Sequence, residues 1–253
     1  MTDTHAHLND PQFTGRIPEV LDRAREHGVL NIIVCGWDIP SSSQAIALAN
    51  SNECIFAITG VHPHDSRIWS QDSLGDVRRF VCENKVVGIG EVGLDYHYDL
   101  DFKEAQEICF RQQLELALET GLPVSVHSRE AMKDTIAILR DYEGLKGVLH
   151  FFTGDRDDLK TLLDMGFYIG VDGPLTFKSS DPLREVIQYA PLQRILLETD
   201  CPYMAPVPFR GKICEPYMIE YILERLSAVL EQDKDYIRDV IDANTYALFG
   251  IRP

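Results

Sequence analysis

The sequence predicts an α/β fold, a single TIM-type (β/α)8 barrel, and three observations support this expectation. Short apolar runs rich in Val and Ile alternate eight times with longer amphipathic segments along 253 residues. No Pro-, Gly- or Ser-rich linker divides the chain, which is long enough for one large core. Continuous apolar runs are typical of strands that are buried on both faces of a parallel sheet. We therefore expect one domain over residues 1–253, with its functional site at the carboxyl ends of the strands.

The eight expected strands share a high content of Val and Ile and lengths of five to eight residues. They are residues 3–7, 29–36, 54–61, 86–91, 123–127, 147–151, 167–172 and 194–200. The pattern alone leaves one alternative open, an open doubly wound sheet. That alternative is disfavoured because no Gly-rich phosphate loop follows the first strand.

Helices are expected between these strands. The first, over 17–27, places Val20, Leu21 and Ala24 on one apolar stripe and stops before Gly28. The remaining expected helices are 41–51, 72–84, 102–120, 130–142, 155–165, 181–190, 215–230 and 233–248.

The charge balance limits the kinds of partner that the protein can bind. With 24 basic and 40 acidic residues the net charge is −16, which argues against a protein that coats nucleic acid through a broad basic face. The same balance is compatible with an enzyme that grips one phosphate at a metal site, because bound divalent cations dominate the local field.

Composition also gives expectations for location and thiol state. The sequence has neither the roughly 20-residue apolar run of a membrane helix nor a signal-peptide pattern, so we expect a cytoplasmic protein. Six cysteines without a CxxC pair predict reduced thiols rather than a disulfide framework. We further expect a monomer that does not bind membranes.

Metal-capable side chains gather at the expected carboxyl ends of five strands. The stretch THAHL places His5 and His7 on one face of the first strand, about 7 Å apart along it. The others are Glu91, His127, His150 and Asp200. A lone buried histidine is usually a hydrogen-bonded core residue. Six such side chains at corresponding strand ends, where a barrel builds its active site, instead predict a metal site.

Glu91 is the side chain best suited to join two ions, because a carboxylate has two oxygens whereas an imidazole ligates one ion. We expect one ion on His5, His7, Glu91 and Asp200, and a second on Glu91, His127 and His150, with open positions for water and substrate. Histidine-rich ligation suits Zn, Mn, Co or Ni better than Mg, but the sequence leaves the identity of the two divalent cations open.

The motifs that carry these residues resemble those of the TatD family of metal-dependent hydrolases, within the amidohydrolase-like barrels. They run in family order and with family spacing across nearly the whole chain. The matching stretches are THAHL at 4–8, GVHPHD at 60–65, GIGEVGLDY at 88–96, GLPVSVHSREA at 121–131, LHFFTG at 149–154, LLETDCPYMAP at 196–206 and RGKICEP at 210–216. The resemblance implies a TIM-like barrel with two-metal DNase activity and places the family's metal positions on the six residues above.

Two positions depart from the family pattern. Phe151 stands where the family usually has a cysteine, and Cys214 stands where it commonly has an asparagine. The second departure puts in doubt any substrate contact that an asparagine amide makes in that loop.

Five further side chains are candidates for substrate binding. His62 and His64 follow the third strand and can donate hydrogen bonds to a phosphate, or can stabilise their own loop. Arg129 can neutralise a substrate phosphoryl group. Alternatively, it pairs with Glu130 or Asp134.

The last two candidates, Arg210 and Lys212, lie in a long loop after the last strand, where they either contact phosphate or are simply solvated. On the last strand, Glu198 alternates with Asp200. It either faces the core or holds a ligand histidine in place.

The expected reaction is hydrolysis of a phosphodiester, with Asp200 and Glu91 as catalytic residues. Two bound cations would acidify a water molecule into a nucleophile, and Asp200 would orient this water or take its proton. A barrel mouth admits a strand end more readily than the middle of a duplex. We therefore expect a DNase that acts on DNA ends, and the family resemblance implies 3′ to 5′ trimming of single strands.

Two other classes of function compete with this expectation. One is a small-molecule amidohydrolase or lactonase, since related barrels use a similar ligand set. Many of those barrels bridge their metals with a lysine at the end of strand four, where this chain has Glu91. The other is a binding protein with a structural metal, which six ligands around an open mouth disfavour.

Overall fold

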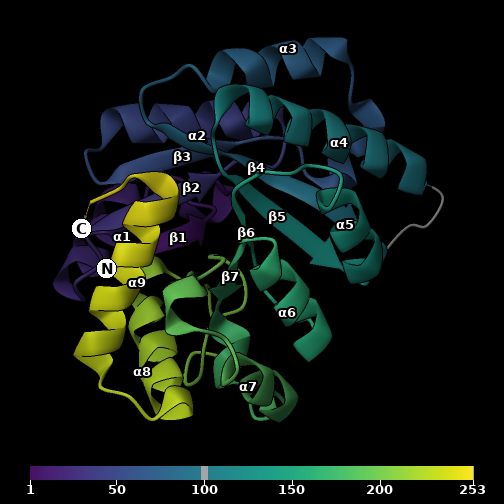
Figure 1. The fold of residues 1–253 in the computed structure, drawn as a ribbon. Coiled ribbons are helices and arrows are strands. Elements are labelled where there is room, and N and C mark those ends of the chain that lie inside the picture. Colours follow the sequence, from purple (N-terminus) through teal and green to yellow (C-terminus); the bar gives the residue numbers. More distant parts are fainter. Residues whose placement is uncertain (98–101, 253) are drawn as a thin grey trace.

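The computed structural model describes residues 1–97 and 102–252, in which eight strands alternate with helices (Figure 1). The strands are β1 (Thr2–Ala6), β2 (Asn31–Cys35), β3 (Ile55–Thr59), β4 (Val86–Asp95), β5 (Val124–Arg129), β6 (Gly147–Leu149), β7 (Tyr168–Val171) and β8 (Ile195–Leu197). Each overlaps an expected strand.

The strands form one parallel sheet in the order β1 to β8, so each strand pairs with the next one in the sequence. The first and last strands then meet beyond the end of β8. There the backbone N–H of His7 donates to the carbonyl of Cys201 at 2.7 Å, and the N–H of Asp200 donates to that of His5 at 3.0 Å. The sheet is thereby nearly closed into a barrel, which confirms the predicted TIM-type fold and excludes the reversed strand order of a doubly wound sheet.

Helices surround the strands on the outside (Figure 1). They are α1 (Ile17–Glu26), α2 (Ile39–Ser51), α3 (Gln71–Phe80), α4 (Lys103–Thr120), α5 (Met132–Leu139), α6 (Arg156–Asp164), α7 (Asp181–Ile187), α8 (Ile219–Leu230) and α9 (Lys234–Phe249). The largest differences from expectation are at α3, which ends four residues early, and at α8, which begins four residues late. Pro216–Met218 forms a 3-10 turn first, because the proline ring fixes the backbone at the start of that turn.

Strand β4 is longer than expected, and the difference matters for the site. It continues to Asp95, so Glu91 lies inside the strand and not at its end as expected. The register against β5 shifts between Ile89 and Val92. At Gly93 the backbone φ is +143°, and a Cβ there would overlap the carbonyl oxygen of His127. Only glycine therefore lets β5 approach β4 this closely.

The other strand ends need smaller corrections. His7 lies one residue beyond β1 and His150 one residue beyond β6, whereas Asp200 lies three residues beyond β8. His127 lies inside β5, which continues to Arg129. All four residues remain at the carboxyl side of the sheet, because a parallel barrel brings every strand end to the same mouth.

Two further expectations concern thiols and membranes. All six cysteines, which fall within the described residues, carry free thiols. Among the described helices, none combines the length and the apolar character that spanning a membrane requires.

Candidate metal centre at the carboxyl ends of the strands

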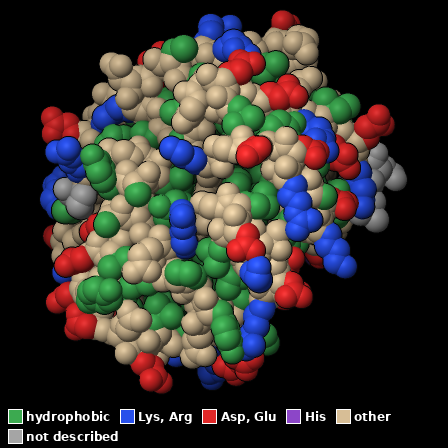
Figure 2. All heavy atoms as spheres, in the orientation of Figure 1, with side chains coloured by type: hydrophobic (Ala, Val, Ile, Leu, Met, Phe, Trp, Pro, Cys, Tyr) green, Lys and Arg blue, Asp and Glu red, His purple; other side chains and the backbone are tan. Residues whose placement is uncertain are grey.

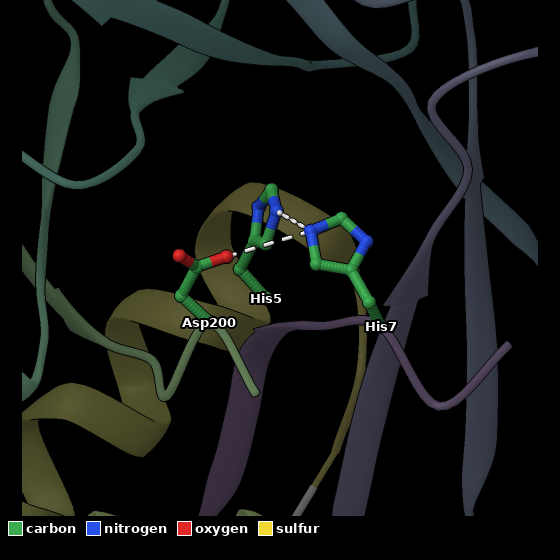
Figure 3. A group of neighbouring side chains, drawn as sticks. All are labelled: His5, His7 and Asp200. Atoms are coloured by element: carbon green, nitrogen blue, oxygen red, sulfur yellow. Dashed lines mark hydrogen bonds and ion pairs between the residues drawn. The ribbon is translucent and has the colours of Figure 1, made fainter. Parts of the chain in front are cut away.

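His5, His7 and Asp200 point toward one another from the ends of β1 and the segment after β8 (Figure 3). The Nε2 atoms of His5 and His7 are 3.3 Å apart, and Nε2 of His7 is 3.4 Å from Oδ1 of Asp200. Oε2 of Glu91 completes the group, at 3.4 Å from Nε2 of His5 and 3.6 Å from Nε2 of His7. Ligands about 2.1 Å from a tetrahedral ion are about 3.4 Å from each other, and these four distances are close to that value.

Neighbouring groups orient the two imidazoles. Nδ1 of His5 lies 3.2 Å from the hydroxyl of Ser125, and Nδ1 of His7 lies 3.1 Å from the carbonyl of Cys35. For His7 this carbonyl accepts a hydrogen bond from Nδ1–H, which leaves the lone pair on Nε2 facing the centre. Partners of this kind fix the tautomer and the ring orientation of metal-binding histidines.

Glu91 presents its second oxygen to a different group of histidines. Oε1 lies 2.9 Å from Nδ1 of His127, 3.7 Å from Nε2 of His62 and 3.8 Å from Nε2 of His150. The carboxylate thus lies between two groups of imidazole nitrogens, as expected of a bridging ligand. Burial by itself would raise the pKa of Glu91, but the charges and hydrogen bonds of the surrounding histidines outweigh burial and hold this pKa well below its usual range.

Glu198 holds His150 in place, which decides between the two interpretations that the sequence allowed. Its Oε1 accepts a hydrogen bond from Nδ1 of His150 at 2.8 Å and another from the backbone N–H of Phe151 at 2.7 Å. Burial lowers the pKa of His150, but the charge and hydrogen bond of Glu198 outweigh burial and raise it to about 10.

Asp95 is a site residue that the sequence analysis missed. Its Oδ2 accepts hydrogen bonds from Nε2 of His127 at 3.1 Å and from Nε2 of His64 at 2.9 Å. The side chain of Gln106 fixes the backbone of Asp95 through two hydrogen bonds of 2.9 Å. With Nε2 of His127 engaged by Asp95, Nδ1 of that ring faces Glu91. The signal in the sequence is an acid four residues after Glu91, but it lies beyond the expected end of the strand.

His62 and His64 occupy different positions. His62 is buried, with its ring centroid 4.5 Å from that of His127, whereas the side chain of His64 is 44% exposed. Nδ1 of His62 accepts from the backbone N–H of His64 at 3.1 Å, so Nε2 carries the proton and faces Glu91. Burial, together with the charge of His127, lowers the pKa of His62 well below its usual value and keeps the ring neutral.

Arg129 ends β5 and is exposed, with its carbonyl accepting a hydrogen bond from the N–H of Tyr96 at 2.9 Å. The two carboxylates considered as its partners also contact other side chains. Glu130 lies 2.6 Å from Nδ1 of His97, and Asp134 accepts from the hydroxyl of Tyr96 at 3.0 Å.

The cations of the loop after β8 lie against aromatic rings. The guanidinium of Arg210 is 3.6 Å from the ring centroid of Phe177, and Nζ of Lys212 is 5.6 Å from that of Phe209. Both side chains are exposed. They belong to the loop at the barrel mouth but lie outside the cluster around Glu91.

The two departures from the family pattern have different surroundings. The ring of Phe151 lies 5.9 Å from that of His150, and its backbone adopts a φ of +50°. Cys214 is fully buried, with its thiol 3.8 Å from the carbonyl of Thr199. A buried thiol in this position has no access to a substrate at the mouth.

Comparison with known proteins assigns the family. The family model described as "TatD related DNase" matches residues 2–250. The chain belongs to the TatD family. This TatD-family chain is 38% identical to the uncharacterized metal-dependent hydrolase YabD of Bacillus subtilis, over 98% of each protein. It is 37% identical to the protein named 3′-5′ ssDNA/RNA exonuclease TatD of Edwardsiella piscicida, over 99% of this chain and 100% of the relative.

Solved structures agree with this assignment. The crystal structure of YjjV, a TatD homolog from Escherichia coli K12, superposes with a TM-score of 0.95 at 31% identity, over 99% of this chain and 98% of YjjV. A TatD-family hydrolase from Entamoeba histolytica gives a TM-score of 0.89 at 26% identity, over 98% and 97% of the two chains. The predicted family, barrel and hydrolase activity are thereby confirmed.

Proposed function

We propose that this TatD-family hydrolase is a divalent-metal-dependent deoxyribonuclease that trims the ends of single-stranded DNA in the 3′ to 5′ direction. The observation that carries the proposal is the position of Glu91, whose two oxygens lie near different imidazole nitrogens, Oε2 near His5 and Oε1 near His127. A relative that aligns along its whole length is named as an exonuclease of this polarity, which supports the choice of substrate.

Six residues would hold two divalent cations. His5, His7, Glu91 and Asp200 would form one site, which the distances of 3.3 to 3.6 Å between their donor atoms support, and Glu91, His127 and His150 would form the other. Asp95 and Glu198 orient the histidines of the second group. This donor set favours Zn, Mn, Co or Ni, with Mg also compatible.

When bound, two divalent cations supply a water nucleophile at neutral pH and stabilise charge on the phosphoryl oxygens. Asp200 takes the proton of the attacking water. Burial would raise the pKa of Asp200, but its hydrogen bond with His7 and the nearby histidines lower it, so the carboxylate is ionised and able to act as a base.

The substrate phosphate needs donors from the protein as well. The neutral ring of His62 directs its Nε2 proton toward Glu91 and can donate it to a phosphoryl oxygen, with His64 held just outside by Asp95. Arg129, Arg210 and Lys212 lie at the mouth, where their charges would attract the strand.

The distribution of surface charge favours strand ends over duplex. On the face shown in Figure 2, basic and acidic side chains are interspersed, and no extended basic surface covers it. With a net charge of −16, such a protein grips few phosphates at a time. We also propose that the chain acts as a monomeric single domain in the cytoplasm, a compartment in which its six free thiols would stay reduced.

The proposal is tested by offering the protein single-stranded DNA beside small substrates. A 5′-labelled oligonucleotide should shorten in single-nucleotide steps from its 3′ end, while a panel of esters, amides and lactones reacts far more slowly. Fast turnover of a lactone or amide together with intact DNA would instead favour the amidohydrolase or lactonase alternative.

A further inference from the structure

Two aromatic side chains stand beside the metal centre and have no part in holding it. Trp37 follows β2, and Tyr203 follows β8, so both lie on loops at the carboxyl ends of strands. The ring centroid of Trp37 is 5.5 Å from that of His7, and that of Tyr203 is 6.2 Å from it. Both rings meet the imidazole edge-on, with interplanar angles of 70° and 64°.

Both rings are accessible to a ligand. Tyr203 is 49% exposed although it is a large aromatic residue, and Trp37 is half-buried. The second tryptophan, Trp69, is also half-buried, but its surroundings differ. It packs against the hydrophobic core, and its indole N–H donates to the side chain of Gln112 at 2.7 Å.

The ring of Tyr203 and the backbone of Trp37 are held in place. The hydroxyl of Tyr203 donates to Asp10 at 3.1 Å. The N–H of Trp37 donates to the hydroxyl of Ser41 at 2.9 Å, and its carbonyl accepts from the N–H of His62 at 2.7 Å. Flat rings that are already ordered lose little conformational entropy when a second ring stacks on them.

We propose that Trp37 and Tyr203 form a stacking platform for the nucleobases that flank the phosphate bound at the metal centre. The inference rests on the proposed nuclease function. It names a source of affinity for the DNA strand other than charge. Every nucleobase has a π-face, so stacking holds a single strand without regard to sequence, and an acidic protein has few phosphate contacts to offer instead.

A different role for the rings is to pack against His7 and keep that imidazole in position. The two roles differ in their dependence on the substrate. A positioning residue affects all substrates equally, whereas a stacking residue matters only where the substrate carries a base.

A direct measurement uses the fluorescence of Trp37. In Trp69→Phe it is the only tryptophan, because the chain has two. The probe is a thymidine oligonucleotide with phosphorothioate linkages at its 3′ end, which resist hydrolysis, added in the presence of Mg²⁺. We expect saturable quenching of Trp37. The matched control, Trp37→Phe, retains only Trp69, whose indole N–H is held by Gln112, and should show no quenching. An oligonucleotide with abasic nucleotides at the 3′ end should bind without quenching.

Kinetics give a second test on the unmodified strand. For the wild type, kcat/KM on base-bearing ends should exceed that on abasic ends by between about 5-fold and 150-fold, the range typical of loss of one stacking contact. Trp37→Ala and Tyr203→Ala should bring this ratio toward one, mainly through KM. Tyr203→Phe, which keeps the ring, should preserve the ratio.

The outcomes separate this inference from the nuclease proposal. If Trp37→Ala and Tyr203→Ala lose kcat/KM equally on base-bearing and abasic ends, the platform is overturned while the nuclease proposal stands. Binding of the oligonucleotide without quenching of Trp37 would have the same meaning. No hydrolysis of DNA by the wild type, with quenching still present, would overturn the nuclease and leave a strand-binding platform. Failure of the wild type to bind the oligonucleotide would overturn both.

Discussion

Glu198 accepts two hydrogen bonds through one oxygen, from Nδ1 of His150 at 2.8 Å and from the backbone N–H of Phe151 at 2.7 Å. The carboxylate occupies space that is free only because residue 170 is glycine, since a Cβ at Gly170 would overlap it. Glu198 is fully buried, and through it β7 and β8 fix the direction in which the imidazole of His150 points.

Glu198→Gln should weaken binding of the second metal ion. The amide keeps the size of the side chain but loses the charge that holds Nδ1 of His150. Changes to such partners typically cost about 10- to 100-fold in metal affinity. Calorimetric titration of metal-free protein measures this loss. Glu220→Gln, on the outer surface beside His27, is the matched control and should bind as the wild type does. Unchanged affinity in Glu198→Gln would mean that this contact does not orient a ligand.

Glu91→Gln should reduce metal binding and hydrolysis more than loss of His5 or His7 alone. The substitution preserves size but removes the charge that both groups of imidazole nitrogens face. We expect loss of at least one bound ion and a fall in hydrolysis of roughly a hundredfold or more. Elemental analysis and initial rates provide the readout. A variant that keeps two ions and normal turnover would show that Glu91 does not bridge.

The thiols should react according to burial. Burial raises the pKa of Cys35, Cys109 and Cys214, so at pH 8 these thiols stay protonated and poorly nucleophilic. A thiol reagent should therefore react first with the exposed Cys82 and more slowly with the half-buried Cys54. A chromogenic disulfide reagent resolves the fast and slow phases of thiol reaction, and Cys82→Ser should remove the fast phase. Rapid reaction of all six thiols in folded protein would contradict the buried positions.

Recognition of strand ends should appear in a comparison of circular and linear single-stranded DNA. The linear form should be degraded and the closed circle spared, because the site is proposed to admit an end. The same assay at several salt concentrations should give a shallow log–log slope, on the order of one per phosphate contact. Equal degradation of circular and linear DNA would overturn end recognition. A steep slope would mean a larger basic surface than the chain offers.

The fold could be predicted from the sequence because each barrel unit repeats the same local signal, an apolar run followed by an amphipathic segment. The error at β4 has a physical cause. The strand continues through Gly93 to Asp95, and a glycine inside an apolar run is usually a sign of an ending or a bulge. With the strand stopped at Glu91, the acid that contacts His64 and His127 fell outside the site.

The six metal-capable residues could be proposed from the sequence because they fall at the expected ends of five strands, a pattern that is visible once the strands are placed. The contacts that hold these side chains in place cannot be predicted in this way. Ser125 and His5 are 120 positions apart, and Glu198 and His150 are 48 apart. Such pairs depend on register between strands and on which face each residue occupies, and a local pattern does not specify either one.

The most direct test of the central claim is hydrolysis of a 5′-labelled single-stranded oligonucleotide by protein from which metal has been removed, with removal verified by elemental analysis. Every residue assigned to chemistry lies in the cluster around Glu91. We therefore expect no shortening of the strand in the metal-free protein. Activity should return on addition of Mn²⁺ or Zn²⁺ and level off near two ions per chain. Full activity in the verified metal-free protein would contradict the account.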